Sequence, residues 1–480
     1  MAKEHQDQTV NGQNYTSQIV VVMVPFPAQG HLNQLLHLSR LISDYNIPVH
    51  FVGTATHIRQ AKLRIQGWNP DSSTTKNTIH FHDFTIPPFP SPPPKPATSP
   101  TATNFPSHLQ PLFDATFHLR EPVSALLRQL SSKSRRVIAI YDSLMAPVVQ
   151  EVGSLPNAES YNFQSVSAFA TFLFFWEEMG KPFEEEVKKI IPEDVPSIEG
   201  CLSSEFLDFI GSRFELIQKC NSGNLYNTSR VIEKPCMGFL DRMTKEKKNW
   251  AIGPFNPVTL LEKKASNGRH FSLEWLDQQE PNSVIYVSFG TTTAFTDEQI
   301  KEMALGLEQS KQKFIWVVRD ADKGDVFDGK EVRKVELPKG FEESVKSRGI
   351  VVRDWAPQLE ILAHSSTGGF LSHCGWNSCM ESITMGVPIG AWPMHSDQPR
   401  NTVLMTKLLK VGIVVREWER RNEIATADVV ADGVKKLMAS EEGEEKRKRA
   451  AELGGAVRKS IEDGGVSRLE FDSFVAHITR

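Results

Sequence analysis

A continuous apolar run from Ile19 to Val24 places the strongest constraint on what this chain can fold into. The run is too short for a helix, rich in β-branched residues and apolar on both faces, which predicts a central strand of a parallel sheet covered on both sides. A turn rich in chain breakers follows at residues 25–30, and leucines at nearly helical spacing predict a helix over 31–42. Residues 49–52 then read as a second strand. This strand–helix–strand order predicts an α/β fold with right-handed crossovers.

The same kind of apolar run recurs along the chain and predicts two α/β domains. In the first half, residues 79–84 and 137–141 read as strands, whereas 164–240 reads as mainly helical. After residues 250–257 short strands and helices alternate again, with strands expected at 283–289, 314–318, 350–352, 369–371, 387–389 and 412–415. We therefore expect an N-terminal domain over residues 1–245, a linker over 246–260 and a C-terminal domain over 261–480.

Two further segments have a composition that fixes their character. Residues 87–100 are dense in proline, which excludes a helix or a central strand. They predict an extended surface loop over a binding cleft, or alternatively a PxxP ligand for a partner domain. The last segment predicts an amphipathic helix that needs a partner surface, with its apolar residues at Leu469, Phe471, Phe474, Val475 and Ile478.

The charge balance excludes several broad classes of partner. The chain holds 54 Lys and Arg against 58 Asp and Glu, a net charge of −4, so there is no general electrostatic case for nucleic acid or an anionic membrane. No apolar run approaches the roughly 20 residues that cross a bilayer, and residues 1–17 lack the layout of a secretory signal. Five cysteines without paired spacings do not form a disulfide framework. We therefore expect a cytoplasmic protein with no integral membrane association.

Two residues that follow strands of the first half are candidates for acid–base chemistry. Ligands of open parallel sheets bind beyond the carboxyl ends of the strands; His31 lies beyond the first strand at the start of a helix, and Asp142 directly follows 137–141. The positive end of the helix favours a neutral imidazole, and the carboxylate is suited to accept its second N–H and to stabilise the charged ring after proton uptake. The alternative is structural: His31 caps a turn and Asp142 caps the next helix.

The second half carries a candidate anion site at the start of a helix. Residues 372–378 follow a predicted strand and lead into a helix for which Asn377 or Ser378 is the expected cap. The free N–H groups of such a helix face the crevice and form a natural pyrophosphate site, to which His373 adds a donor. Thr291, which follows another strand, is a small donor suited to the same anion.

Glu381 and Trp355 extend this pattern to a whole nucleotide. Glu381 has two oxygens for the vicinal hydroxyls of a ribose, and the planar indole of Trp355 suits stacking on a base. The alternative is a glycine-rich, well-capped structural helix. Other chemistries lack their motifs: His373, Cys374 and Cys379 have no second Cys/His pair at zinc-ligand spacing, and there is no P-loop, no G-x-G-x-x-G after an opening strand and no G-x-S-x-G.

Residues 355–398 closely resemble the signature of the plant UDP-sugar-dependent glycosyltransferases, and the similarity extends over essentially the whole chain, including 25–31 and 284–290. The resemblance implies the GT-B fold, in which two Rossmann-like domains face each other and a C-terminal helix returns toward the N-terminal domain. It also implies residues that bind the donor. Those for the base, ribose and diphosphate are Trp355, Ala356, Gln358, His373, Asn377, Ser378 and Glu381; those for the sugar are Trp376, Asp397 and Gln398; Ser165 and Thr291 approach the phosphates or the sugar.

The resemblance further implies an inverting reaction in which His31 is the catalytic base and Asp142 its partner. His31 deprotonates an acceptor hydroxyl, which displaces UDP in one in-line step, and helix N–H groups with His373 stabilise the leaving diphosphate without a metal or other cofactor. Gln398 favours UDP-glucose as the donor without excluding UDP-xylose. One departure from the family pattern is Gln34, where many members have proline.

Within the family, residues 53–64, 288–293 and 465–468 most resemble the zeatin O-glucosyltransferases. This implies a UDP-sugar donor and a small hydroxylated acceptor, the side-chain hydroxyl of a cytokinin, bound by a monomer. Acceptor pockets of the family come from variable loops, so a flavonoid, isoflavonoid or terpenoid glucosyltransferase is the alternative. A non-catalytic binding protein is disfavoured, because binding alone needs neither His31 nor Asp142.

Overall fold

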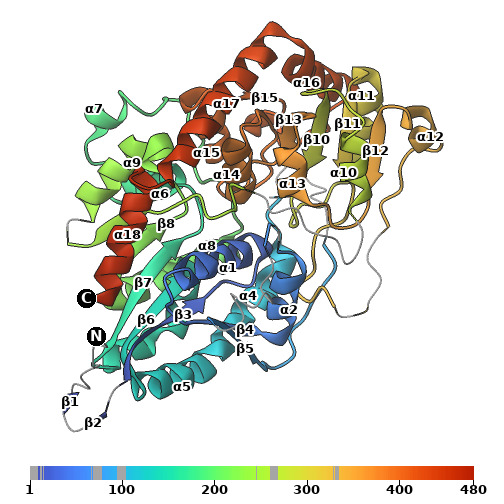
Figure 1. Cartoon of the computed structure of the whole chain (residues 1–480). Helices are drawn as coiled ribbons and strands as arrows, with labels where there is room; N and C mark the ends of the chain where they lie inside the picture. Colours follow the sequence, from blue (N-terminus) through green and yellow to red (C-terminus); the bar gives the residue numbers. More distant parts are fainter. Residues whose placement is uncertain are drawn as a thin grey trace, which may run out of the picture.

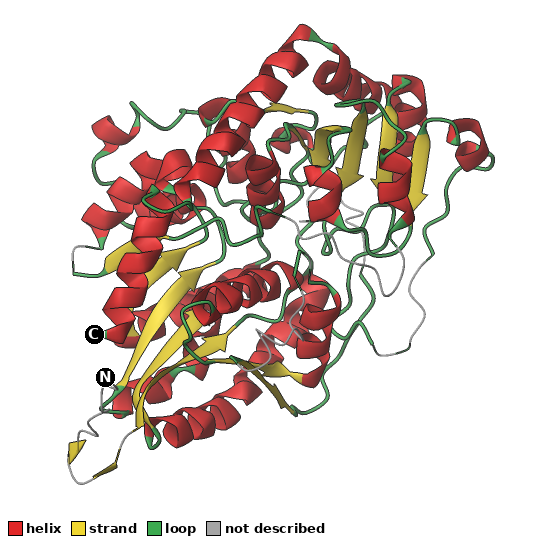
Figure 2. Ribbon diagram, in the orientation of Figure 1, coloured by secondary structure: helices red, strands yellow, loops and turns green. Residues whose placement is uncertain are grey.

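Two parallel β-sheets, each covered by helices on both faces, form the frame of the molecule (Figure 1; Figure 2). The computed structural model describes the chain apart from residues 1–8, 11–12, 15, 66, 69–77, 95–103, 245, 260–268, 328 and 330–333. We call the described residues up to Pro257 the first unit and those from Arg269 to Ser460 the second unit. The predicted α/β class with two Rossmann-like sheets is confirmed. In the part of the chain so described, no helix has the length and apolar character needed to span a membrane.

The first sheet has seven parallel strands in the order β5-β4-β3-β6-β7-β8-β9. Their bounds are β3 (Thr16–Val24), β4 (Val49–Thr54), β5 (Ile79–Phe84), β6 (Ser134–Asp142), β7 (Ala158–Gln164), β8 (Asn221–Tyr226) and β9 (Lys248–Ala251). A separate antiparallel pair consists of β1 (Thr9–Val10) and β2 (Gln13–Asn14). The opening apolar run is β3 in the middle of the sheet, and its side chains alternate between two cores: Val21 and Met23 face one, Val20 and Val22 the other.

Helices of the first unit cover both faces of this sheet or pack in the core shared with the second unit. They are α1 (Gln29–Ser43), α2 (Ala55–Leu63), α4 (Gln110–Ala115), α5 (Arg120–Ser131), α6 (Ala168–Glu178), α7 (Glu184–Val187), α8 (Ser204–Cys220) and α9 (Arg230–Met243). Helices α1 and α2 cover one face together with α18 (Val466–Thr479), the last helix of the chain, and α4, α5 and α8 cover the other.

The second sheet has six parallel strands in the order β12-β11-β10-β13-β14-β15. Their bounds are β10 (Val284–Ser288), β11 (Lys313–Val317), β12 (Gly349–Val352), β13 (Thr367–Ser372), β14 (Ile389–Ala391) and β15 (Gly412–Val414). The helices are α10 (Phe271–Leu276), α11 (Asp297–Ser310), α12 (Phe341–Val345), α13 (Gln358–Ala363), α14 (Trp376–Met385), α15 (Gln398–Val403), α16 (Ala427–Ala439) and α17 (Glu441–Ser460). The core between this sheet and α14 and α17 continues into α6 and α9, so apolar packing joins the two units.

Three strands at one side of the first sheet, β7, β8 and β9, lie where the sequence predicted none. β8 interrupts residues 164–240, which were expected to be mainly helical, and β9 lies inside the expected linker 246–260, so the first sheet extends to Ala251. These strands lack an apolar run because buried amides pair across them. Asn162 donates to Asn224 at 3.3 Å, and Asn224 donates to Asn249 at 2.9 Å. Amides that bond one another stand here in place of the apolar side chains by which a central strand is recognised.

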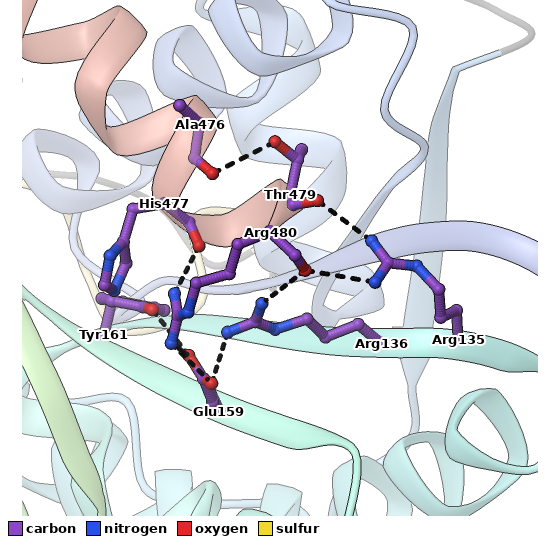
Figure 3. A network of polar contacts seen from close by, with 8 residues as sticks. All are labelled: Arg135, Arg136, Glu159, Tyr161, Ala476, His477, Thr479 and Arg480. Atoms are coloured by element: carbon purple, nitrogen blue, oxygen red, sulfur yellow. Dashed lines mark hydrogen bonds and ion pairs between the residues drawn. The ribbon is translucent and has the colours of Figure 1, made fainter. Parts of the chain in front are cut away.

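The last helix docks on the first unit, as the amphipathic pattern requires. Phe471, Phe474 and Ile478 are buried in the same core as α1. At the end of the helix, the guanidinium groups of Arg135 and Arg136 donate to the backbone oxygens of Thr479 and Arg480 (Figure 3). Arg480 donates in turn to Glu159, which lies on β7. Both apolar and charged contacts therefore fasten α18 to the first sheet.

The proline-rich segment has no helix or strand where the structure describes it, over residues 87–94; residues 95–103 lie outside the described residues. Its Ser91 hydroxyl accepts a hydrogen bond from the backbone of Asp325 at 3.0 Å. The segment thus contacts the second unit through Ser91.

The docking of α18 yields a stability prediction. Phe474 is fully buried, with its ring centroid 5.4 Å from that of Tyr161 and 5.3 Å from that of Trp250. Phe474→Ala should lower the free energy of unfolding by about 3–5 kcal/mol, because it removes apolar burial and leaves a cavity. Urea unfolding followed by circular dichroism measures the change. As a control, Leu469→Ala on the exposed side of the same helix should change stability by less than about 0.5 kcal/mol; equal losses in both variants would contradict the docking described.

Candidate functional site

A cavity of about 420 Å³ lies between the two units, at the carboxyl ends of both sheets. Residues that follow β3, β6 and β7 form one side, and residues that follow β10, β12, β13 and β14 form the other. All but one of the candidate site residues line it, namely His31, Ser165, Thr291, Trp355, Ala356, Gln358, His373, Trp376, Asn377, Ser378, Glu381, Asp397 and Gln398. The exception is Asp142, which is fully buried behind the wall.

His31 and Asp142 meet because β3 and β6 are neighbouring parallel strands, so that the residues beyond them lie at one edge. Nδ1 of His31 lies 2.7 Å from Oδ2 of Asp142. A carboxylate only accepts hydrogen bonds, so Nδ1 carries the proton and Nε2 is the free base. The other carboxylate oxygen accepts the backbone N–H of Leu144 at 3.0 Å. Asp142 therefore both caps the following 3₁₀ helix and orients His31, and the two interpretations of its role hold together.

The first turn of α14 points into the cavity and is capped by Gly375. The expectation that Asn377 or Ser378 caps this helix is wrong, because both residues lie inside the first turn and their side chains bond elsewhere. Nδ2 of Asn377 donates to the carbonyl of Gly30 at 2.7 Å, and the Ser378 hydroxyl accepts from Gln358 at 3.1 Å. Backbone N–H groups at the start of α14 are left for a ligand, an arrangement that favours an anion.

His373 follows β13 and is packed between two glycines beside this helix start. A Cβ atom on Gly290, which has a φ of +75°, would lie 2.7 Å from Nε2 of His373, and one on Gly375 would lie 2.5 Å from it. Burial lowers the pKa of His373 to about 4, so its ring is neutral at pH 7. Nδ1 has no hydrogen-bond partner among the described residues. A neutral imidazole with one unpaired nitrogen is suited to bind a polar ligand at the start of α14.

Glu381 lies one turn further along α14 and is held by Gln358. Nε2 of Gln358 donates to Oε2 of Glu381 at 2.7 Å. Burial raises the pKa of Glu381 to about 7, despite the opposing effect of this hydrogen bond. Trp355 and Ala356 line the cavity immediately before Gln358. Trp355, Glu381 and the start of α14 thus line the same cavity, a set of groups that suits a base, a ribose and a diphosphate.

Asp397 and Gln398 lie beyond β14, beside the helix start. Oε1 of Gln398 accepts the backbone N–H groups of Met394 at 2.9 Å and of His395 at 3.0 Å, which fixes the amide group. Oδ2 of Asp397 accepts from Asn401 at 2.7 Å, and burial raises the pKa of Asp397 above its usual value. Three hydrogen bonds therefore orient a carboxyl and an amide of neighbouring residues, a pair suited to the hydroxyl groups of a sugar.

The hydrogen bonds of Gln34 explain why this chain has glutamine where many members of the family have proline. Its Nε2 donates to the backbone oxygen of Ser165 at 2.8 Å, and its Oε1 accepts from Asn227 at 3.1 Å. A proline at this position makes neither bond. Asn227 also accepts, through its backbone oxygen, the indole N–H of Trp376 at 2.9 Å, so the side chain of Trp376 is already bonded and its backbone is what remains for a ligand.

The apolar half of the cavity contains residues that sequence reasoning did not name individually. Aromatic and aliphatic side chains of α6, α8 and residues 105–113 form this wall, among them Phe105, Phe113, Phe174, Phe206, Phe214 and Ile217. Gln164 and Arg213 are polar members of the same wall. The aromatic density of residues 168–178 was the available signal, but the same pattern is typical of any buried helix. The wall fits a small acceptor with a planar or apolar body.

Metal and disulfide chemistry find no support in the described residues. No group of three or more His, Cys, Asp or Glu side chains there is placed to hold a metal ion. The cysteines at 201, 220, 236, 374 and 379 are all free thiols.

Comparisons with known proteins agree on one family. Residues 17–257 match the model of the "Glycosyltransferase, N-terminal domain", and residues 264–443 match "UDP-glucoronosyl and UDP-glucosyl transferase". The chain is 58% identical to a zeatin O-glucosyltransferase of Phaseolus lunatus over 97% of this chain and 98% of the relative. It is 55% identical to a zeatin O-xylosyltransferase of Phaseolus vulgaris over 97% and 99% of the two chains.

A solved structure confirms the implied GT-B fold. The crystal structure of a UGT transferase from Siraitia grosvenorii in complex with UDP has a TM-score of 0.74 and 26% identity, and the match covers 96% of this chain and all of that one. Two facing Rossmann-like units are therefore the fold of both chains.

The raised pKa of Glu381 yields a prediction about stability. The folded chain holds this proton up to about pH 7, whereas an exposed glutamate loses it near 4.5. Its contribution to stability is therefore complete below pH 4.5 and is lost as pH rises through 7. Between pH 5 and pH 8 the free energy of unfolding of the wild type should fall by about 1–3 kcal/mol more than that of Glu381→Gln, which cannot ionise. Urea unfolding at both pH values measures this difference. As a control, Glu298→Gln on the surface of α11 should show the pH dependence of the wild type. The same pH dependence in Glu381→Gln would contradict the assignment of the raised pKa to Glu381.

Proposed function

This chain is a member of the UDP-glycosyltransferase family, and we propose that it transfers glucose from UDP-glucose to the side-chain hydroxyl of a cytokinin such as zeatin. The identity of 58% to a zeatin O-glucosyltransferase supports the acceptor class. A relative at 55% is a xylosyltransferase, so UDP-xylose is the donor against which glucose must be compared.

The observation that carries the proposal is the placement of the His31–Asp142 pair opposite the start of α14. The imidazole and the helix start belong to different units and line the same cavity. The bond from Asn377 to the Gly30 carbonyl ties the first turn of α14 to the first turn of α1, which bears His31. A proton acceptor and an anion site at two sides of one small cavity are what a transfer with a diphosphate leaving group needs.

The proposed reaction is a single in-line displacement. Nε2 of His31 takes the proton of the acceptor hydroxyl while its oxygen forms a bond to the anomeric carbon. The bond from that carbon to the UDP oxygen breaks, both electrons leave with UDP, and the configuration at the carbon inverts. The carboxylate of Asp142, bound to Nδ1 at 2.7 Å, stabilises the imidazolium that forms.

In this proposal, groups of the protein stabilise the negative charge on the departing UDP, and no metal or other cofactor is assigned. The N–H groups at the start of α14 and the neutral ring of His373 face the diphosphate. Trp355 takes the uracil base, Gln358 and Glu381 the ribose, and Asp397 and Gln398 the glucose hydroxyls. Ribose hydroxyls that donate to Glu381 favour its ionised carboxylate and so oppose the rise in pKa that burial causes.

The acceptor side of the cavity is predominantly apolar, which supports a planar, poorly hydrated acceptor, a class that includes cytokinins, flavonoids and terpenoids. We further propose that the enzyme works as a monomer in the cytosol, where its five free thiols stay reduced.

A direct assay tests the donor and the acceptor together. Incubation with UDP-glucose and trans-zeatin should give a product heavier by one hexose in mass spectrometry. The kcat/KM for trans-zeatin should exceed that for a panel of flavonoid and terpenoid hydroxyls, and UDP-glucose should be used faster than UDP-xylose. A strong preference for a phenolic acceptor would replace the cytokinin assignment while leaving the reaction intact.

The assignment of the base has its own test. His31→Ala should lower kcat by about 10³-fold or more, because no other group at this point takes the acceptor proton. Calorimetric binding of UDP should stay within about twofold of wild type, since His31 does not hold the nucleotide. Asp142→Asn should lower kcat with UDP binding preserved. Wild-type turnover in His31→Ala would show that the base lies elsewhere.

A further inference from the structure

Arg64, the residue at which α2 ends, reaches from the first unit to two separate loops of the second. Its guanidinium carbon lies 4.8 Å from the centroid of the Trp355 ring. Nη2 donates to Oδ1 of Asp322 at 3.0 Å, and Nη1 is bonded to Oδ2 of the same carboxylate. A guanidinium group is suited to both contacts at once, because its N–H groups lie in the plane that pairs with a carboxylate while its face packs on an aromatic ring.

Asp322 is a charged anchor for this arginine. Its side chain is nearly buried, and although burial raises the pKa of its carboxyl, Arg319 and Arg64 outweigh that effect and hold the pKa below its usual value. Its backbone N–H donates to the carbonyl of Thr291 at 2.7 Å, so Asp322 is also bonded to the cavity wall. An ionised carboxylate therefore sits next to the donor side of the cavity and fixes one edge of the Arg64 guanidinium.

The other edge of Arg64 is fixed by the first unit. Oε1 of Gln29 accepts from Nη1 of Arg64 at 3.2 Å and from Gln60 at 2.9 Å. Gln29 is the first residue of α1, the helix that carries His31. The guanidinium group is thus held on both sides, by an amide near the proposed base and by a carboxylate near the proposed donor site.

Other contacts hold the loop around Asp322 without help from Arg64. Nε2 of His108 lies 2.8 Å from the Asp322 carbonyl, and Nε2 of His57 lies 3.3 Å from that of Gly324. Ser91 bonds the backbone of Asp325 at 3.0 Å. Because these bonds join the units independently, the effect of Arg64 on Trp355 is separable from the joining of the units.

We propose that Arg64 is a positioning residue for the donor nucleotide: it holds the indole of Trp355 so that one ring face receives uracil while the guanidinium packs on the other. Binding of the donor then depends on a side chain from the opposite domain. The inference rests on the proposed function, since it takes Trp355 as the platform for the base. It assigns to Arg64 no contact with the reacting atoms.

Kinetics distinguish this role from a catalytic one. The uracil base lies at the end of UDP-glucose that is farthest from the anomeric carbon. Loss of the support for the Trp355 indole therefore weakens the binding of the ground state and of the transition state equally. Such a loss raises KM for the donor and leaves kcat unchanged. Loss of acceptor binding is not expected, because Arg64 does not line the cavity.

The test uses the full chain with Arg64→Met, which keeps an unbranched apolar stem and removes the guanidinium. The Kd for UDP and the KM for UDP-glucose should rise about tenfold, with kcat and the acceptor KM within about twofold of wild type. Arg64→Lys, which keeps the charge but not the two-pronged contact, should give a rise of about threefold and carries the test if Arg64→Met does not fold. Lys407→Met is the matched control, because Lys407 pairs with Asp194 across the two units without lining the cavity, and it should bind UDP as wild type does.

A double-mutant cycle shows whether Arg64 acts through Trp355. In a Trp355→Leu background, Arg64→Met should cause no further loss of UDP binding. Equal losses in both backgrounds would show that Arg64 only joins the domains, and unchanged or tighter UDP binding in Arg64→Met would show that it does not support the ring; either result overturns the inference. Failure of the wild type to bind UDP would instead overturn the proposed function, and the inference with it.

Discussion

One hydrogen bond, from Nδ2 of Asn377 to the carbonyl of Gly30, joins the first turns of α14 and α1 across the cavity. Each of these helices begins just beyond the carboxyl edge of its own sheet, so the contact sets the separation between an imidazole on one sheet and an anion site on the other. Neither half of the chemistry is useful alone. His31 without the helix start has no leaving group to work against, and the helix start without His31 only binds an anion.

The parts of this arrangement that sequence predicts are those with a local cause. A β-branched run such as Ile19–Val24 must be covered on both faces. In the structure the side chains from Val20 to Met23 alternate between two buried cores, one on each face of the sheet. Residues directly beyond such strands gather at one edge, which is why their positions make His31 and Asp142 candidates, and the pairing of β3 with β6 brings the two side chains together. The long signature from Trp355 to Gln398 identifies the family, and the cavity contains each residue drawn from it.

The parts that sequence did not predict depend on partners far along the chain. β7 to β9 carry buried asparagines that are acceptable in a sheet only because Asn162, Asn224 and Asn249 bond one another. Asn377 and Ser378 are residue types that often form N-caps, but their side chains are hydrogen-bonded to Gly30 and Gln358 instead. The aromatic wall of the acceptor side and the stacking of Arg64 on Trp355 likewise have no local pattern, because each exists only where two distant segments meet.

The fastening of α18 to the first sheet has a mechanical consequence. The chain passes from the first unit to the second after β9 and returns to the first after α17, so two backbone connections join the units in addition to their shared apolar core. Because α17 packs in the second unit and α18 in the core of the first sheet, any displacement of one unit relative to the other loads the short return between these helices, where Gly464 has a φ of +81°.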